Sequence, residues 1–208
     1  MYTKKQQEII KYTRAKVYSY MGENPVAGHG ADHAARVAEW AVQIAKKEKA
    51  NIFLSEMAGL LHDVGRALEG MNGSEDSKKR HHELSYEICQ EWFRNDEILN
   101  KLSNSEKLNL LYSVRYHWNN AADKYLEAII LRDADKMDLF GKIGIERNER
   151  FWNYDREKIM LQMRFRTDDM FWIRTKTARV FFEKHKMFDP ILKYTIKKLK
   201  EDIHPVEL

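Results

Sequence analysis

The chain has 208 residues, of which 43% are hydrophobic and 33% charged, and its formal net charge at pH 7 is +4. This length suffices for one large domain with a buried core, and so modest a charge does not call for a nucleic-acid partner. No apolar run reaches the roughly 18 residues of a membrane-spanning helix, and the N-terminal residues lack the apolar segment of a signal peptide. Because Cys89 is the sole cysteine, an internal disulfide is excluded and we expect a cytoplasmic protein.

Helical periodicity extends along most of the chain, and no alternating strand pattern is bounded by turns. The sequence therefore predicts an all-α helical bundle with additional C-terminal helices. In chain order, the predicted helices cover residues 4–21, 32–49, 55–64, 82–94, 104–118, 123–132, 134–147, 155–166, 169–186 and 190–202. We expect Ser55 to cap the third helix, and Ser103 with Glu106 to form a capping box for the fifth, which ends at His117.

We predict a single domain over residues 1–208, with an N-terminal helix in 1–26, a core in 27–147 and a C-terminal helical extension in 148–208. The longest glycine-, serine- and charge-rich segment runs from Gly70 to Arg80. Its basic end, Lys78 to Arg80, is either a solvated loop or a lid that folds over a phosphate.

Aromatic residues are frequent in the last third of the chain. Their helical spacing favours a place in the core, and stacking on a base is the alternative. These residues are Phe151, Trp152, Phe165, Phe171, Trp172, Phe181 and Phe182.

An apolar stretch from Met57 to Val64 contains the adjacent pair His62 and Asp63. A buried helix has little reason to hold an imidazole beside a carboxylate, since ionised groups in the interior are costly unless they are paired or bound to a metal. The pair therefore needs partners from elsewhere. The segments 32–37 and 131–138 supply candidates.

Histidine and aspartate from these segments form a plausible ligand set: His33, His62, Asp63 and Asp133. Two imidazoles and two carboxylates suit a divalent ion such as Mn, Fe, Co, Ni, Zn or Mg. Side chains of neighbouring helical residues point about 100° apart, so His62 and Asp63 can share a metal only from positions that flank it. Residues of other helices must therefore complete the coordination shell. Such a set leaves coordination positions open for water and substrate.

The four residues and their flanks resemble the H…HD…D signature of the HD-domain metal-dependent phosphohydrolases. The matching stretches are Asp-His-x-x-Arg-Val around His33, Leu-Leu-His-Asp-Val-Gly around His62, and Asp-Ala-Asp-Lys-Met-Asp at 133–138. Residues 141–145 and 175–188 resemble a small bacterial branch of uncharacterised HD-superfamily hydrolases. The likeness covers about residues 27–202 and implies an all-helical fold with cleavage of phosphate esters or anhydrides, in several members those of nucleotides.

The resemblance implies that His33, His62, Asp63 and Asp133 are the metal ligands, with Asp63 also orienting the attacking water. The position three after Asp63 often holds a catalytic lysine or acid in the family, whereas here it is Arg66. Arginine does not donate a proton at neutral pH but can clamp a phosphate, so we expect electrostatic catalysis from Arg66.

Further side chains are expected to bind phosphate oxygens or a second metal, with simple helix-cap roles as the alternative for the histidines: Arg36, His81, His82 and His117. For Asp135, metal binding and ion pairing are alternatives that the sequence does not separate. Asp138 is expected to pair with Lys136 or Arg132. His29 is expected to be a loop residue rather than a ligand.

The leading hypothesis is a metal-dependent phosphohydrolase that cleaves a nucleotide or another small phosphate with a metal-activated water. The alternatives are a non-catalytic nucleotide sensor, a di-iron oxygenase of the HD type and a nucleic-acid phosphodiesterase. The mild charge disfavours the last of these. The expected partner is thus a small-molecule phosphate, with no membrane contact; a homodimer is left open.

Overall fold

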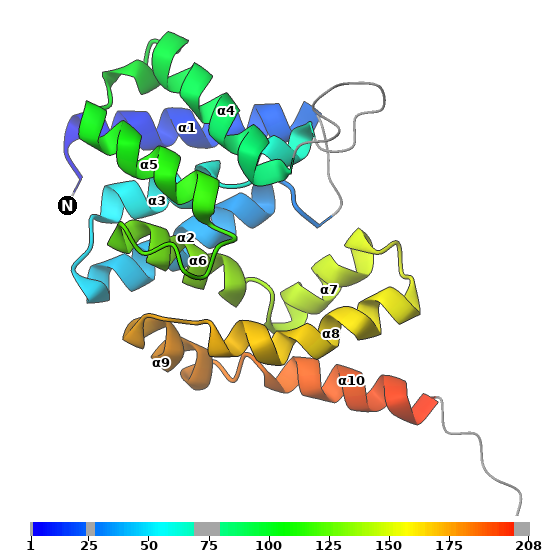
Figure 1. The fold of residues 1–208 in the computed structure, drawn as a ribbon. Helices are drawn as coiled ribbons and strands as arrows, with labels where there is room; N and C mark the ends of the chain where they lie inside the picture. Colours follow the sequence, from blue (N-terminus) through cyan, green and yellow to red (C-terminus); the bar gives the residue numbers. More distant parts are fainter. Residues whose placement is uncertain (1, 24–27, 69–79, 202–208) are drawn as a thin grey trace, which may run out of the picture.

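The computed structural model describes residues 2–23, 28–68 and 80–201 (Figure 1). These residues form ten α-helices and two short 3-10 helices, and no strand occurs among them, which confirms the all-α prediction. The elements are α1 (Lys4–Glu23), α2 (Ala31–Glu48), α3 (Ile52–Leu61), η1 (Val64–Ala67), α4 (His81–Asn95), η3 (Leu99–Lys101), α5 (Asn104–Tyr116), α6 (Leu126–Met137), α7 (Gly141–Phe151), α8 (Arg156–Phe171), α9 (Lys176–Lys184) and α10 (Asp189–Glu201). None of the described helices combines the length and hydrophobicity needed to cross a bilayer.

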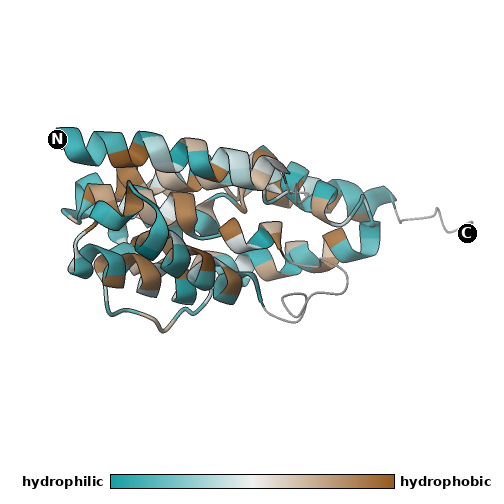
Figure 2. Ribbon diagram, turned by 90° about the horizontal axis from the view of Figure 1, so that it is seen from above, coloured by the Kyte–Doolittle hydropathy of each residue, from teal (hydrophilic) through white to brown (hydrophobic). Residues whose placement is uncertain are grey.

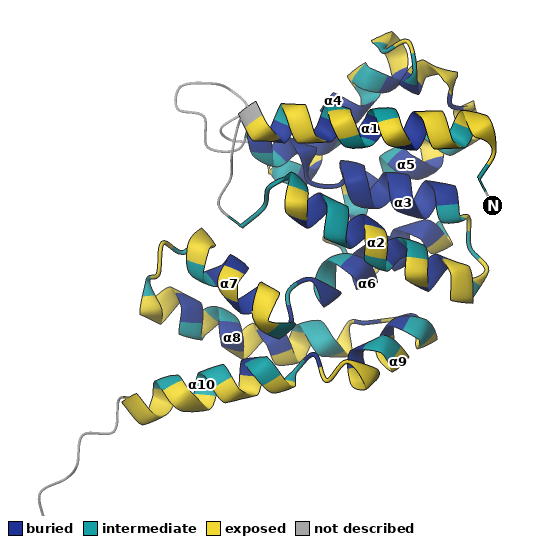
Figure 3. Ribbon diagram, turned by 180° about the vertical axis from the view of Figure 1, so that it is seen from behind, coloured by how far each residue is buried: buried dark blue, intermediate teal, exposed yellow. Residues whose placement is uncertain are grey.

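The helices form two groups, with α1–α6 in one and α7–α10 packed below it in the view of Figure 1. Most helices carry both teal and brown segments in Figure 2, as amphipathic helices that bury one face do. Buried residues concentrate in α2, α3 and α6, whereas α8 and α10 are largely exposed (Figure 3). The single-domain organisation stays a prediction.

Helix α3 lies at the centre, and nine of its ten residues are buried, from Phe53 to Leu61. It packs closely on α2 because Gly59 has no side chain: a Cβ at this position would lie 2.5 Å from the Cα of Ala38. The prediction that Ser55 caps this helix was wrong. Asn51 is the cap, accepting from the backbone N–H of Leu54, while Ser55 lies one turn inside and donates its hydroxyl to the Asn51 carbonyl.

The capping box of α5 is confirmed: Ser103 accepts from the backbone N–H of Glu106, whose carboxylate accepts from the Ser103 backbone. The helix ends at His117, as expected.

The predicted break between residues 132 and 134 was wrong, because α6 continues through Met137. The chain turns instead before Gly141, which has a positive φ of 70° and donates its N–H to the carbonyl of Met187. This difference matters for the site. It places Asp133 and Asp135 on one continuous helix, about 200° apart around its axis, so that they face opposite sides.

The aromatic residues of the last third divide between core and surface. Phe182 is buried, as the helical spacing predicts. The core prediction was wrong for four others, which expose 38% to 71% of their surface: Phe151, Phe165, Phe171 and Trp172.

Candidate metal centre

The site begins where α2 and α3 meet. His33 lies in the first turn of α2 and His62 is the C-cap of α3; both are fully buried. The close α2–α3 packing brings their Nε2 atoms to 3.2 Å. Asp63 follows His62 directly, outside the helix, with φ −111° and ψ 12°. The structure thus brings together three of the four residues that the sequence predicts as ligands.

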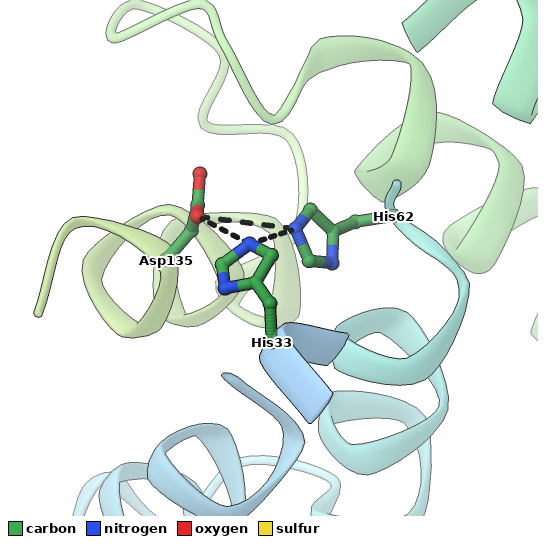
Figure 4. Close-up of side chains that lie close together, drawn as sticks. All are labelled: His33, His62 and Asp135. Atoms are coloured by element: carbon green, nitrogen blue, oxygen red, sulfur yellow. Dashed lines mark hydrogen bonds and ion pairs between the residues drawn. The ribbon is translucent and has the colours of Figure 1, made fainter. Parts of the chain in front are cut away.

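Asp135 of α6 completes a first cluster with His33 and His62 (Figure 4). Its Oδ1 lies 3.3 Å from the Nε2 of His33 and 3.8 Å from that of His62. The side chain of Asp135 is 27% exposed, whereas the two imidazoles are buried. Solvent therefore reaches the cluster from the Asp135 side.

The hydrogen bonds of the two imidazoles fix which nitrogens face the cluster. The Nδ1 of His62 lies 2.8 Å from the carbonyl of Gly59, and the Nδ1 of His33 lies 2.7 Å from Asp138 Oδ2. Both partners are acceptors, so each Nδ1 carries a proton, and in its neutral form each ring presents an Nε2 lone pair to the cluster. In that form the two lone pairs and the carboxylate oxygen, which lie within 4 Å of one another, would hold a cation between them.

A second cluster forms on the other side of Asp63, with His81 of α4 and His117 at the end of α5. Asp63 Oδ1 lies 3.6 Å from His81 Nε2 and 3.7 Å from His117 Nε2. This oxygen is buried and has no hydrogen-bond partner within the described residues. His117 donates from Nδ1 to the carbonyl of Val114, which again turns a lone pair toward the cluster.

Asp63 joins the two clusters. Its other oxygen, Oδ2, lies 3.7 Å from His33 Nε2 and 3.6 Å from His62 Nε2. Burial opposes ionisation of Asp63, but the electrostatic interactions with His62 and with the Arg66 guanidinium outweigh it and hold the pKa of Asp63 well below the usual range. Burial lowers the pKa of His117 to about 3, so that this imidazole is neutral near pH 7. Asp63 would thus offer one oxygen to each of two metal sites.

The structure does not bring Asp133 to either cluster, and this corrects the predicted ligand set. Its carboxylate accepts three hydrogen bonds, from the backbone N–H groups of Arg174 and Thr175 and from the hydroxyl of Thr175. All three hold the start of α9 against α6. The reason is the phase of the helix: Asp135, two residues on, is the one that faces the imidazoles.

Asp138 and Arg36 form a support behind His33 rather than a phosphate site. Asp138 pairs with Arg36 through two hydrogen bonds of 2.8 and 3.1 Å and with Arg147 at 2.8 Å. The expected pairing of Asp138 with Lys136 or Arg132 was therefore wrong in its partners.

Arg36 also contacts Asp32, so its guanidinium is committed to carboxylates and the phosphate role predicted for it is not supported. Arg147 was missed, because its spacing in the sequence gives no sign of this contact.

Arg66 and His82 differ in their relation to the clusters. The Nε of Arg66 lies 3.5 Å from Asp63 Oδ2, beside the bridging carboxylate. His82 lies outside both clusters, with its ring packed 5.2 Å from that of Trp118. Its predicted role in binding phosphate or metal is thus not supported. The residues Lys78 and Lys79 of the predicted lid lie outside the described residues.

The donor set of each cluster fits a divalent cation. Imidazole nitrogen combined with carboxylate oxygen suits Mn, Fe, Co, Ni and Zn, and this set does not single out one of them. The imidazoles of His33, His62 and His117 are oriented by bonds from their second nitrogen, as is usual for metal-binding histidines. His33, His62, Asp63 and Asp135 would hold one ion. Asp63, His81 and His117 would hold another.

Comparison with known proteins agrees with this geometry. The family model described as "HD domain" matches residues 30–139, more than half of the chain. A search of curated proteins found no match.

Among solved structures, Bacillus subtilis YpgQ in complex with ADP is 21% identical with a TM-score of 0.69, covering 98% of this chain and all of that one. A predicted HD-superfamily hydrolase from an uncultured Thermotogales bacterium is 24% identical with a TM-score of 0.60, covering 94% and 91% of the two chains. An HD-superfamily hydrolase from Bacillus thuringiensis is 22% identical with a TM-score of 0.67, covering 94% of this chain and 97% of that one.

The family match extends from the loop before His33 to just beyond Asp138, so it includes every residue of the first cluster. The structural neighbours share the helical arrangement along nearly the whole chain, and two of them are described as HD-superfamily hydrolases. This chain belongs to the HD-domain family.

Proposed function

We propose that this protein is a metal-dependent phosphohydrolase that acts on a nucleotide or another small phosphate. The observation that carries the proposal is the position of Asp63, whose two oxygens face two separate sets of imidazoles. Two adjacent cations are the arrangement that phosphoester hydrolysis commonly uses to hold the attacking and leaving oxygens. The ADP complex of the Bacillus subtilis relative supports a nucleotide as the substrate.

The bound metal would supply a water of lowered pKa as the nucleophile. The carboxylates of Asp63 and Asp135 would help to bind the metal that carries this water. Because Asp135 is partly exposed, water and substrate would enter the site from its side. Arg66 lies beside Asp63 and offers a permanent positive charge to the phosphoryl oxygens as charge develops on them. No side chain has to act as a nucleophile.

The same set of ligands is compatible with a second function, a di-iron oxygenase, because two clusters share a carboxylate. A third possible function is a nucleotide sensor without turnover, because position 66 holds an arginine instead of the lysine or acid that is often catalytic in the family. The oxygenase predicts oxygen consumption and about two irons per chain. The sensor predicts intact bound nucleotide.

The test is release of phosphate and pyrophosphate from a panel of nucleotides and small phosphoesters, with Mn, Co, Ni, Mg and Zn in turn. Asp63→Ala is the inactive variant. Asp123→Ala is the matched control, because it makes the same change at an exposed aspartate that belongs to neither cluster. Metal-dependent release without oxygen, lost in Asp63→Ala and retained in Asp123→Ala, supports the hydrolase. Absence of release with every metal would refute it.

A further inference from the structure

A cavity of about 310 Å³ lies against the metal centre, between η1 and the helices α7 and α8. Its polar and aromatic lining includes Arg66, Arg147, Asn148, Trp152, Gln162 and Arg166. The cavity is connected to the centre on two sides. Arg66 lies 3.5 Å from Asp63 Oδ2, and Arg147 bonds to Asp138, the carboxylate that holds His33.

Two buried donors in this lining lack a partner. Asn148 Nδ2 and Arg166 Nε have no hydrogen-bond partner among the described residues, although each residue is only 6% exposed. A buried donor without an acceptor costs about 1–3 kcal/mol. Because both atoms belong to side chains that line the same cavity, a ligand with neighbouring acceptors would satisfy them together.

Each arginine of the lining already lies beside a carboxylate, Arg66 beside Asp63 at 3.5 Å. Arg166 pairs with Asp169 at 2.8 Å, and Arg147 pairs with Asp138 at the same distance. The cavity is therefore rich in donors, and none of its arginines lacks a carboxylate partner. A polyphosphate chain would require unpaired cations, so the lining suits a neutral group that carries acceptors.

Aromatic rings stand at the wall of the cavity. Phe151 and Trp152 both line it, with their ring centroids 4.9 Å apart and their planes at 80°. His29, also in the lining, contacts Phe151 edge-on at 4.9 Å. Aromatic walls with donors at one edge suit a planar heterocycle.

We propose that this cavity, the base pocket, binds the base of the substrate, and that Asn148 and Arg166 select a base whose keto oxygen lies beside a ring-nitrogen acceptor, as in 6-oxopurines. Arginine recognises this pair of acceptors in guanine. An adenine would place its amino group against the two donors. The inference rests on the proposed function, since it takes the base to be part of the nucleotide whose phosphate lies at the metal centre.

The test is binding of inosine and adenosine, which differ in the keto and amino groups, to the full chain in EDTA by calorimetry. We expect inosine to bind at least about tenfold more tightly, since one unpaired buried donor is worth a factor of that order. Asn148→Asp replaces a donor by an acceptor at constant shape and should reduce or reverse this preference. Asn104→Asp, the same change at an exposed position, should leave it unchanged.

Equal affinity for the two nucleosides, or binding of neither, overturns the base pocket without any variant. Binding of inorganic triphosphate in EDTA that displaces inosine also overturns it, because phosphate would then occupy the cavity. Arg166→Lys is the second variant and should weaken inosine binding. Hydrolysis of bis(p-nitrophenyl) phosphate with Mn²⁺ tests the metal centre without a base, so failure of one proposal is distinguishable from failure of the other.

Discussion

The structure replaces Asp133, the ligand expected from the sequence, by Asp135, and this difference can be tested with two variants. Asp133→Asn and Asp135→Asn are the same chemical change, two residues apart on α6. The resemblance to the family signature assigned the metal to Asp133, whereas the structure places Asp135 at the imidazoles. The two variants should therefore fail in different ways, one in stability and the other in metal binding.

The magnitudes follow from the contacts. Asp133 is fully buried and accepts three hydrogen bonds of 2.7 to 2.9 Å, and the asparagine would turn one acceptor oxygen into a donor facing N–H groups. We expect a loss of about 3 kcal/mol, which for a chain of this length lowers Tm by about 9 °C. Asp135→Asn removes a charged ligand, so metal affinity should fall at least 100-fold, beyond the 10–100-fold effect of an outer partner.

The assay combines thermal unfolding in EDTA with titration of Mn²⁺ by calorimetry. Asp133→Asn should unfold earlier yet bind Mn²⁺ with nearly unchanged affinity at a temperature where it is folded. Asp135→Asn should unfold within about 1 kcal/mol of the parent and bind Mn²⁺ weakly, because its side chain is partly exposed and makes no comparable set of bonds. The opposite pattern would refute the assignment of Asp135.

Three further outcomes are expected. His117→Ala should reduce bound Mn²⁺ from two ions per chain to one, measured by metal analysis after dialysis; an unchanged count would exclude the second cluster. Gly59→Ala should destabilise the fold by about 2 kcal/mol in chemical unfolding, since the added Cβ meets the backbone of Ala38 at 2.5 Å; an unaltered midpoint would contradict the close α2–α3 packing. Burial disfavours the charged form of Asp96, but bonds from the Leu99 N–H and the hydroxyl of Tyr12 outweigh it and lower its pKa to about 2. Because its pKa is lower in the folded than in the unfolded chain, ionised Asp96 stabilises the fold above about pH 4, by about 1 kcal/mol after solvent screening. This contribution is lost as the pH falls from about 4 to about 2. The unfolding free energy of Asp96→Asn, measured over the same pH range, should lack this loss.

Helix content and most helix positions were predictable because they depend on local sequence. The apolar period of α2 and the capping box of Ser103 and Glu106 both act within a few residues, and both were confirmed. The cap of α3 was not, since Asn51 and Ser55 are both suitable residues one turn apart. Only the packing of the apolar residues Phe53 and Leu54 into the core decides that the helix starts at the earlier one.

The candidate site was predictable in part. His62 and Asp63 are adjacent at the end of an apolar helix, and this unusual placement alone predicted a functional pair. His33 followed from its flanking residues. His81 and His117 were among several histidines at helix ends, and no local signal separated them from His82. The three-dimensional approach of α4 and α5 to Asp63 makes that separation.

By itself the sequence determined an all-helical chain with a His-Asp pair that needs partners, because burial and helical periodicity are properties of neighbouring residues. The tertiary structure decided which partners those are. Asp133 and Asp135 are equivalent in type and nearly so in position, but α6 continues to Met137 and turns them to opposite sides. The choice of ligand thus depends on the rotation of one helix against two others, which no local pattern specifies.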